Sequence, residues 1–146
     1  MRLETGQARR RFAAQPVARL ATADARGMPH LVPVTFAVAG DTIVFAVDAK
    51  PKASADLRRL RNIAANPNVS FLADHYDDDW SRLWWVRADG TATILRARDD
   101  PAVETETDIA LLQRKYPHYQ HNPPHGPVVR TTVTAWRGWA ASAVPD

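Results

Sequence analysis

Alternating apolar residues restrict the fold of this chain more than any other feature of its sequence. Two segments, 30–38 and 68–73, carry an apolar side chain at every second position. These side chains are Val32, Val34, Phe36 and Val38 in the first segment and Val69, Phe71 and Ala73 in the second. Because successive side chains of a β-strand point to opposite faces, the pattern predicts strands with one buried face.

Turn and cap signals divide the rest of the chain into further elements. Turns at 24–27 and 39–41 separate strands expected at 17–23, 30–38 and 42–47. An Ala-Asp-Gly turn at 88–90 predicts a hairpin between strands at 83–87 and 91–96, and a last strand is expected at 128–140. Helices are expected at 4–14, from a Ser54 cap to the Asn66-Pro67 stop, and from Pro101 to about Tyr116.

The order of these elements favours one architecture. Consecutive antiparallel strands with few helices predict a mainly β fold, a barrel whose openings are covered by short helices. The chain has 146 residues, no internal repeat and no linker, so a single domain over residues 1–146 is expected.

Composition excludes several classes of protein. There is no cysteine, which removes disulfides, thiolate nucleophiles and cysteine metal sites. No uncharged apolar stretch comes near the roughly 18 residues of a membrane span, and residues 1–4 lack the apolar run of a secretory signal. We therefore expect a cytoplasmic protein that makes no membrane contact. The net charge of +3 gives little support for nucleic-acid binding.

The basic residues gather in one short stretch. Between Lys50 and Arg61 five cations face a single acid, and they are Lys50, Lys52, Arg58, Arg59 and Arg61. Pro51 stiffens the loop, and the following helix begins close by, with Ser54 as its cap. The N–H groups and partial positive charge of a helix N-terminus suit a phosphate, and an arginine can add a bidentate contact. The stretch predicts a site for a small anion, with a solvated charged loop as the alternative.

An acidic and aromatic segment follows the strand at 68–73. Trp80, Trp84 and Trp85 lie within six residues of one another, so at least one of them is expected to meet a core, a partner or a planar ligand. The three aspartates at 77–79 lack the spacing of a calcium loop, and no metal site is expected there.

Other catalytic motifs are missing from the sequence. His118, His121 and His125 lie in a segment with Pro123-Pro124, which favours a mobile loop over a helical zinc site. No Gly-x-Ser-x-Gly, Walker-type or dinucleotide-binding glycine pattern is present.

Five segments, taken in order, resemble the split β-barrel flavin and deazaflavin oxidoreductases related to pyridoxamine 5′-phosphate oxidase. More narrowly, the chain resembles the actinobacterial branch that uses the deazaflavin coenzyme F420. The resemblance runs from Val17 to about Leu95. The segments are Val17-Ala18-Arg19-Leu20-Ala21-Thr22, Gly27-x-Pro29-His30-x-Val32-Pro33-Val34, Lys50-Pro51-Lys52, Leu60-Arg61-Asn62-Ile63-x-x-Asn66-Pro67 and Asp79-Trp80-Ser81-Arg82-Leu83-Trp84-Trp85-Val86.

The resemblance implies a fold, a reaction and a set of binding residues. The fold is an antiparallel split β-barrel that forms a homodimer, with the ring of the cofactor between two subunits, against the second and third strands. The reaction is hydride transfer between the reduced deazaflavin and an electron-poor small organic substrate. The implied cofactor-binding residues are Lys50, Lys52, Ser54 and Arg58 at the phosphate and acidic tail, Val32, Pro33, Val34 and Thr35 beside the ring, and Trp80 and Arg82 towards the cofactor of the neighbouring subunit.

The resemblance leaves other points open. No catalytic side chain is implied, because the cofactor carries the chemistry, and a proton could come from His75, Tyr76 or solvent. His30 stands where FMN-binding relatives commonly have an arginine, and 49–52 departs from their Ser-Arg-Lys, which favours the deazaflavin. The alternatives are an FMN-binding oxidoreductase and a non-enzymatic flavin or deazaflavin carrier. The sequence does not define the physiological substrate.

Overall fold

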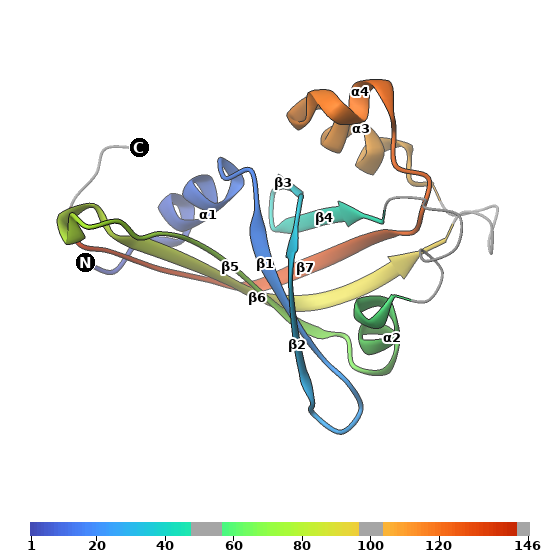
Figure 1. Ribbon diagram of the computed structural model, residues 1–146, viewed down its shortest axis with the longest axis horizontal. Helices are drawn as coiled ribbons and strands as arrows, with labels where there is room; N and C mark the ends of the chain where they lie inside the picture. Colours follow the sequence, from blue (N-terminus) through green and yellow to red (C-terminus); the bar gives the residue numbers. More distant parts are fainter. Residues whose placement is uncertain (48–56, 97–103, 143–146) are drawn as a thin grey trace.

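The computed structural model describes residues 1–47, 57–96 and 104–142, which form a seven-stranded antiparallel sheet with short helices (Figure 1). The strands are β1 (Ala18–Ala23), β2 (Pro29–Val34), β3 (Ala37–Ala39), β4 (Thr42–Ala46), β5 (Asn68–His75), β6 (Trp84–Leu95) and β7 (Val128–Ala140). The helices are α1 (Thr5–Ala13), α2 (Arg58–Ala65), the 3-10 helix η1 (Trp80–Arg82), α3 (Glu106–Lys115) and α4 (Pro117–His121). The expected class, mainly antiparallel β with short helices, is confirmed.

The sheet is strongly curled but does not close. Its strand order is β2-β1-β5-β6-β7-β4-β3, so β2 and β3 are the two edges. Only Thr35 and Phe36 separate these edges along the chain, and the sheet must therefore curl until its edges approach at that corner. The single strand expected at 30–38 is wrong, because the chain leaves one edge of the sheet there and joins the other.

Two tyrosines hold this corner. The Tyr116 hydroxyl accepts a hydrogen bond from the Phe36 N–H at 3.0 Å, and it lies 2.8 Å from the Pro16 carbonyl oxygen. The Tyr119 hydroxyl lies 2.9 Å from Thr35 Oγ1. Tyr119 belongs to α4, so the segment of His118, His121 and His125, which was expected to be a loop, begins with a short helix.

Strand β6 replaces the expected hairpin. It runs straight through 88–90 and pairs with β5 on one side and β7 on the other. The register against β7 shifts between Asp89 and Gly90, which marks a β-bulge. A Cβ on Gly90 would lie 2.3 Å from the Thr132 carbonyl oxygen, so this glycine permits a close approach of two strands.

Helix α1 fills the inside of the curled sheet. The Phe12 ring lies 4.7 Å from Phe36, 6.3 Å from Phe71 and 5.4 Å from Trp136, measured between ring centroids. The helix begins at Thr5, after a capping box formed by Glu4 and Gln7, within the expected range.

Helices α2 and α3 begin later than expected. Helix α2 starts at Arg58 with Leu57 at its N-cap position, and Ser54 lies outside the described residues. Helix α3 starts at Glu106, and Pro101 also lies outside them. No helix in the described part of the chain is long and apolar enough to cross a membrane.

Candidate functional site

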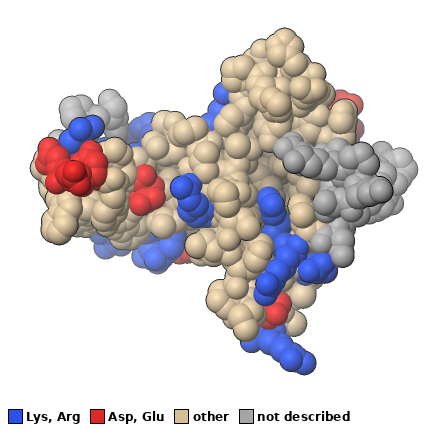
Figure 2. All heavy atoms as spheres, viewed as in Figure 1, with Lys and Arg blue, Asp and Glu red and all other residues tan. Residues whose placement is uncertain are grey.

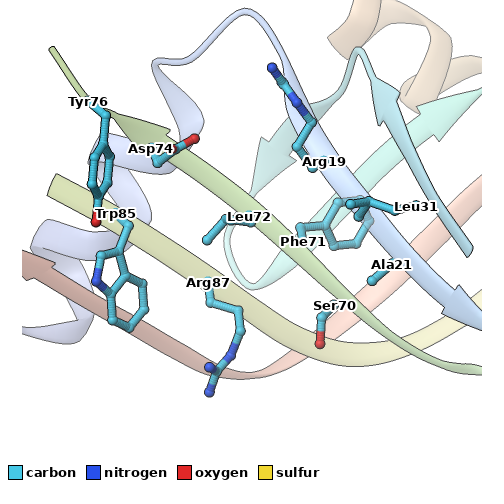
Figure 3. A pocket seen from close by; sticks show the side chains of 10 residues that line it. All are labelled: Arg19, Ala21, Leu31, Ser70, Phe71, Leu72, Asp74, Tyr76, Trp85 and Arg87. Atoms are coloured by element: carbon cyan, nitrogen blue, oxygen red, sulfur yellow. The ribbon is translucent and has the colours of Figure 1, made fainter. Parts of the chain in front are cut away.

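The outer face of the sheet, opposite the core, holds the candidate site. A hollow of about 570 Å³ lies on this face over β2, β1, β5 and β6 (Figure 3). Its size falls within the range of about 300–1,000 Å³ that is typical of small-molecule sites. The lining residues are Arg19, Ala21, Leu31, Ser70, Phe71, Leu72, Asp74, Tyr76, Trp85 and Arg87.

Strand register arranges the hollow in rows. Arg19, Leu72 and Arg87 are direct cross-strand neighbours on β1, β5 and β6. A second row lies two residues along each strand from the first, and its side chains are mostly smaller. It contains Leu31, Ala21, Ser70 and Asp89. On the other side lies an aromatic row with Asp74, Trp85 and Trp139. The small Ala21 and Ser70 side chains give the hollow its depth.

Large apolar side chains are exposed in this hollow. Leu31 is 67% exposed, Leu72 is 38% exposed and Tyr76 is 60% exposed. Figure 3 shows Tyr76 and Trp85 at one end and Leu31 at the other, while Arg19 and Arg87 extend to opposite sides. An exposed apolar patch with a charged rim is typical of a surface that a ligand or another protein covers.

Arg87 is held in place by a polar network. Its Nε donates to Asp89, at 3.0 Å from Oδ1 and 3.2 Å from Oδ2. The Ser70 hydroxyl donates to the same carboxylate at 2.7 Å. The Asp89 backbone carbonyl accepts a bond from Thr134 Oγ1 at 3.1 Å. The network around Asp89 therefore joins three strands, β5, β6 and β7.

A second hollow of about 420 Å³ adjoins the first and shares Ala21 and Ser70 with it. It lies over the end of β1, the start of β5 and the bulge at Asp89 and Gly90. Together the two hollows form a groove that runs from Trp85 towards Pro29, at the end of the loop between β1 and β2.

A cationic region lies beyond this end of the groove. Arg58 is exposed at the first position of α2, and its charge helps to lower the pKa of Asp24 in the β1–β2 loop. The larger causes of that lowered pKa are the Met28 and Arg26 N–H groups, which donate to the Asp24 carboxylate. Figure 2 shows basic side chains gathered over α2 and the adjoining loop. The expected tail residues Lys50, Lys52 and Ser54 lie outside the described residues.

The four predicted ring contacts lie on or next to β2. Pro33 is exposed on the outer face, Val32 is half-buried and Val34 is buried. Thr35 follows the strand and contacts Tyr119. Since β2 is an edge of the described sheet, one side of its backbone has no strand partner there.

Trp80 and Arg82 are not brought to the groove within one chain. Both belong to η1, which lies at the opposite end of the molecule from α2 (Figure 1). Trp80 is 76% exposed, and Arg82 Nη1 is 3.6 Å from Asp77 Oδ2. Their predicted contact with a cofactor therefore requires a second copy of the chain.

Of the two proton donors considered, Tyr76 lines the hollow and His75 does not. His75 Nε2 is 2.8 Å from Asp77 Oδ2, and this hydrogen bond is the main cause of the lowered pKa of Asp77. Asp79 in turn accepts the Ser81 N–H at 3.0 Å. In the part of the chain that the structure describes, no group of three metal-ligating side chains is found.

Sequence reasoning missed most of the hollow. It did not select Arg19, Leu31, Leu72 or Arg87 as binding residues. One signal was present, because Leu72 is apolar at an outward position of a strand whose inward positions, Phe71 and Ala73, are apolar too. Apolar residues at both the inward and the outward positions of a strand indicate that both faces of the sheet are covered there.

Comparison with known proteins identifies a family and several solved structures that share the fold of this chain. A family model described as pyridoxamine 5′-phosphate oxidase matches residues 5–140. No curated protein sequence matches the chain. The structure of a FAD-binding protein from Mesorhizobium loti is similar, with a TM-score of 0.71, 19% identity, and coverage of 94% of this chain and 95% of that chain.

Two further structures share the fold. A FAD-binding protein from Mycobacterium smegmatis has a TM-score of 0.63 and 23% identity, and covers 95% of this chain and 97% of its own. The heme storage protein HutZ from Vibrio cholerae has a TM-score of 0.67 and 15% identity, and covers 92% of this chain and 94% of its own. At such identities these likenesses establish the fold alone.

Proposed function

This chain belongs to the pyridoxamine 5′-phosphate oxidase family, and on that premise we propose that it is an oxidoreductase that uses coenzyme F420. The observation that carries the proposal is the groove on the outer face. It combines an apolar hollow, suited to a flat ring, with a cationic end at α2, suited to an acidic tail. FMN is the alternative cofactor, and the FAD-binding neighbours support a flavin-type ring in general.

The described residues fit such a cofactor. Leu31 and Trp85 provide apolar contact for a ring, and the free edge of β2 offers backbone groups beside it. Arg58 would hold the acidic tail.

The cofactor, when bound, supplies the hydride chemistry, and the protein binds, orients and excludes water. Leu31 and Leu72 would cover the faces of flat molecules in the hollow and keep water out. Tyr76 lines the hollow with a hydroxyl that can hold a proton for the substrate. Ser70 also lines it, but its hydroxyl already donates to Asp89.

A homodimer is part of the proposal. Leu31, Leu72 and Tyr76 leave an apolar patch on the outer face, and Trp80 adds an exposed aromatic side chain at the tip of the sheet. A second copy seated on this face would bury the patch and bring its own η1 within reach of the groove. Such an arrangement would place the cofactor ring between two subunits.

The test is a side-by-side titration of the full chain with coenzyme F420, FMN and FAD. We expect coenzyme F420 to bind most tightly. Arg58→Gln should weaken its binding about ten-fold, because a charge-assisted contact contributes about 1.5–3 kcal/mol. Arg114→Gln, an equal charge change at an exposed position of α3, is the control.

The outcomes separate the alternatives. Tighter binding of FMN or FAD would identify a flavin enzyme and overturn the deazaflavin assignment. Binding of coenzyme F420 without oxidation of its reduced form, across a panel of enones and quinones, would indicate a carrier. Absence of binding by all three cofactors contradicts the proposal.

A further inference from the structure

Three arginines lie in a single row across the outer face of the sheet. Arg19 on β1 opposes Leu72 on β5, and Leu72 opposes Arg87 on β6. Arg87 in turn opposes Arg137 on β7. Directly opposed residues of antiparallel strands project from the same face, and like charges placed opposite each other destabilise a sheet. The row therefore holds an excess of positive charge that the strands themselves do not favour.

Two described carboxylates lie on this face, Asp89 beside Arg87 and Asp74 in the lining of the hollow, so the three arginines exceed the acids by one. Arg19 and Arg137 form no hydrogen bond or ion pair with any residue that the structure describes. Arg87 is bound to Asp89 through Nε, and its two terminal nitrogens have no partner in the same ranges. Asp89 fixes the direction of the Arg87 side chain and leaves the planar end of its guanidinium group available.

Apolar and aromatic side chains surround these cations. Leu72, 38% exposed, lies between Arg19 and Arg87, whose backbones are two strand spacings apart, or roughly 10 Å. Trp85 lies one outward position along β6 from Arg87. The hollow thus offers a flat apolar floor with a guanidinium group on either side (Figure 3).

We propose that this arginine row binds the substrate, and that the substrate class is a planar conjugated carboxylic acid. This inference rests on the proposed function and names the substrate of the same groove. A guanidinium group matches a carboxylate with two parallel hydrogen bonds, and it stacks on aromatic faces. A flat conjugated body covers Leu72 and Trp85, while its carboxylate reaches Arg87 or Arg19. A neutral molecule of the same shape leaves the cations unpaired.

The test compares two probes of equal shape, trans-cinnamate and its neutral amide, by isothermal titration calorimetry with the full chain. We expect the acid to bind at least about ten-fold more tightly than the amide. At least one of the variants Arg87→Gln and Arg19→Gln should lower the affinity for the acid about ten-fold, and both should leave the affinity for the amide unchanged. Arg114→Gln is the matched control and should change neither. Arg19 is exposed and has no hydrogen-bond or ion-pair partner among the described residues, so its variant tests the row without disturbing the Asp89 network.

Each contrary result has a distinct meaning. Equal binding of acid and amide, failure of the acid to bind, or full affinity in both variants overturns the proposal. A shift in sedimentation coefficient with unchanged acid affinity would assign the row to a subunit contact. If the same variants also lose affinity for coenzyme F420 or FMN, the arginine row belongs to the cofactor site, and this result also overturns the proposal. Cofactor titration of the unmodified chain tests the proposed function separately.

Discussion

Lys115, the last residue of α3, is held in an environment that disfavours its charge. Its ammonium nitrogen lies 3.7 Å from the centre of the Phe36 ring, and no described residue accepts a hydrogen bond from it. Burial lowers the pKa of Lys115 to about 8, from an ordinary value of 10.5. The cation–π contact with Phe36 therefore offsets only part of the lost hydration.

Replacement of Lys115 by methionine should stabilise the protein at neutral pH. Methionine keeps the shape of the side chain and removes the cost of desolvating a charge. We therefore expect the free energy of unfolding to rise by on the order of 1 kcal/mol, after allowance for solvent screening, together with a higher melting temperature. Between pH 8 and 10.5 the unfolded chain binds more protons at Lys115 than the folded chain does, so the stability of the unmodified protein rises with pH.

Thermal melts of both proteins at pH 7 and pH 10.5 check this expectation. The difference in stability between them should shrink as the pH rises, because at pH 10.5 Lys115 is neutral in the folded chain and half deprotonated in the unfolded chain. A variant that is less stable at pH 7, or a difference that does not change with pH, would contradict it.

Strand β6 shows why the helices and strands could be predicted only in part from the sequence. Residues 84–95 could be read as two strands and a turn, because Ala-Asp-Gly is a common hairpin signal. Gly90 instead serves the close approach of β7, and that strand begins at Val128, nearly forty residues later. The β2–β3 break is similar, since Tyr116 and Tyr119 hold it from a distant helix pair. Strand β7 matched its expected range of 128–140, although its buried positions change phase between Val133 and Trp136, opposite the bulge in β6.

The role assigned to Gly90 leads to a paired prediction at this scale. Gly90→Ala should cost at least about 2 kcal/mol, because its Cβ would meet a backbone oxygen that cannot move aside. Gly6→Ala in α1 meets only the flexible end of Arg10, at 3.2 Å, and should raise stability by up to about 1 kcal/mol. Urea unfolding of the two variants measures both values. Equal effects would show that Gly90 is not confined by β7.

The candidate site belongs to the scale of the whole molecule. The cationic end at Arg58 was expected from sequence, because its charges lie close together along the chain. The hollow could not be expected from the sequence, because it is formed by outward-facing residues of four strands, and only the folded sheet defines how those strands are aligned. Sequence periodicity finds the core face of a strand, and it says little about which outward residues become neighbours.

The proposed dimer gives a prediction at this scale. Leu72→Lys should shift the protein from dimer to monomer, because it adds a further positive charge between Arg19 and Arg87, in the centre of the covered patch. Val17→Lys is the control, because Val17 is also 38% exposed but does not line the hollow. Sedimentation velocity across a range of concentrations distinguishes the species. A Leu72→Lys protein that stays dimeric would place the subunit contact elsewhere.

The position of β7 in the sheet has a consequence for synthesis on the ribosome. This strand lies between β6 and β4, so it joins two groups of strands that share no other pairing in the described sheet. Until residues 128–140 have left the exit tunnel, the β3–β4 hairpin has only itself to pair with, and hairpins alone are barely stable in water. The β3–β4 edge therefore joins the rest of the sheet only after β7 has been synthesised.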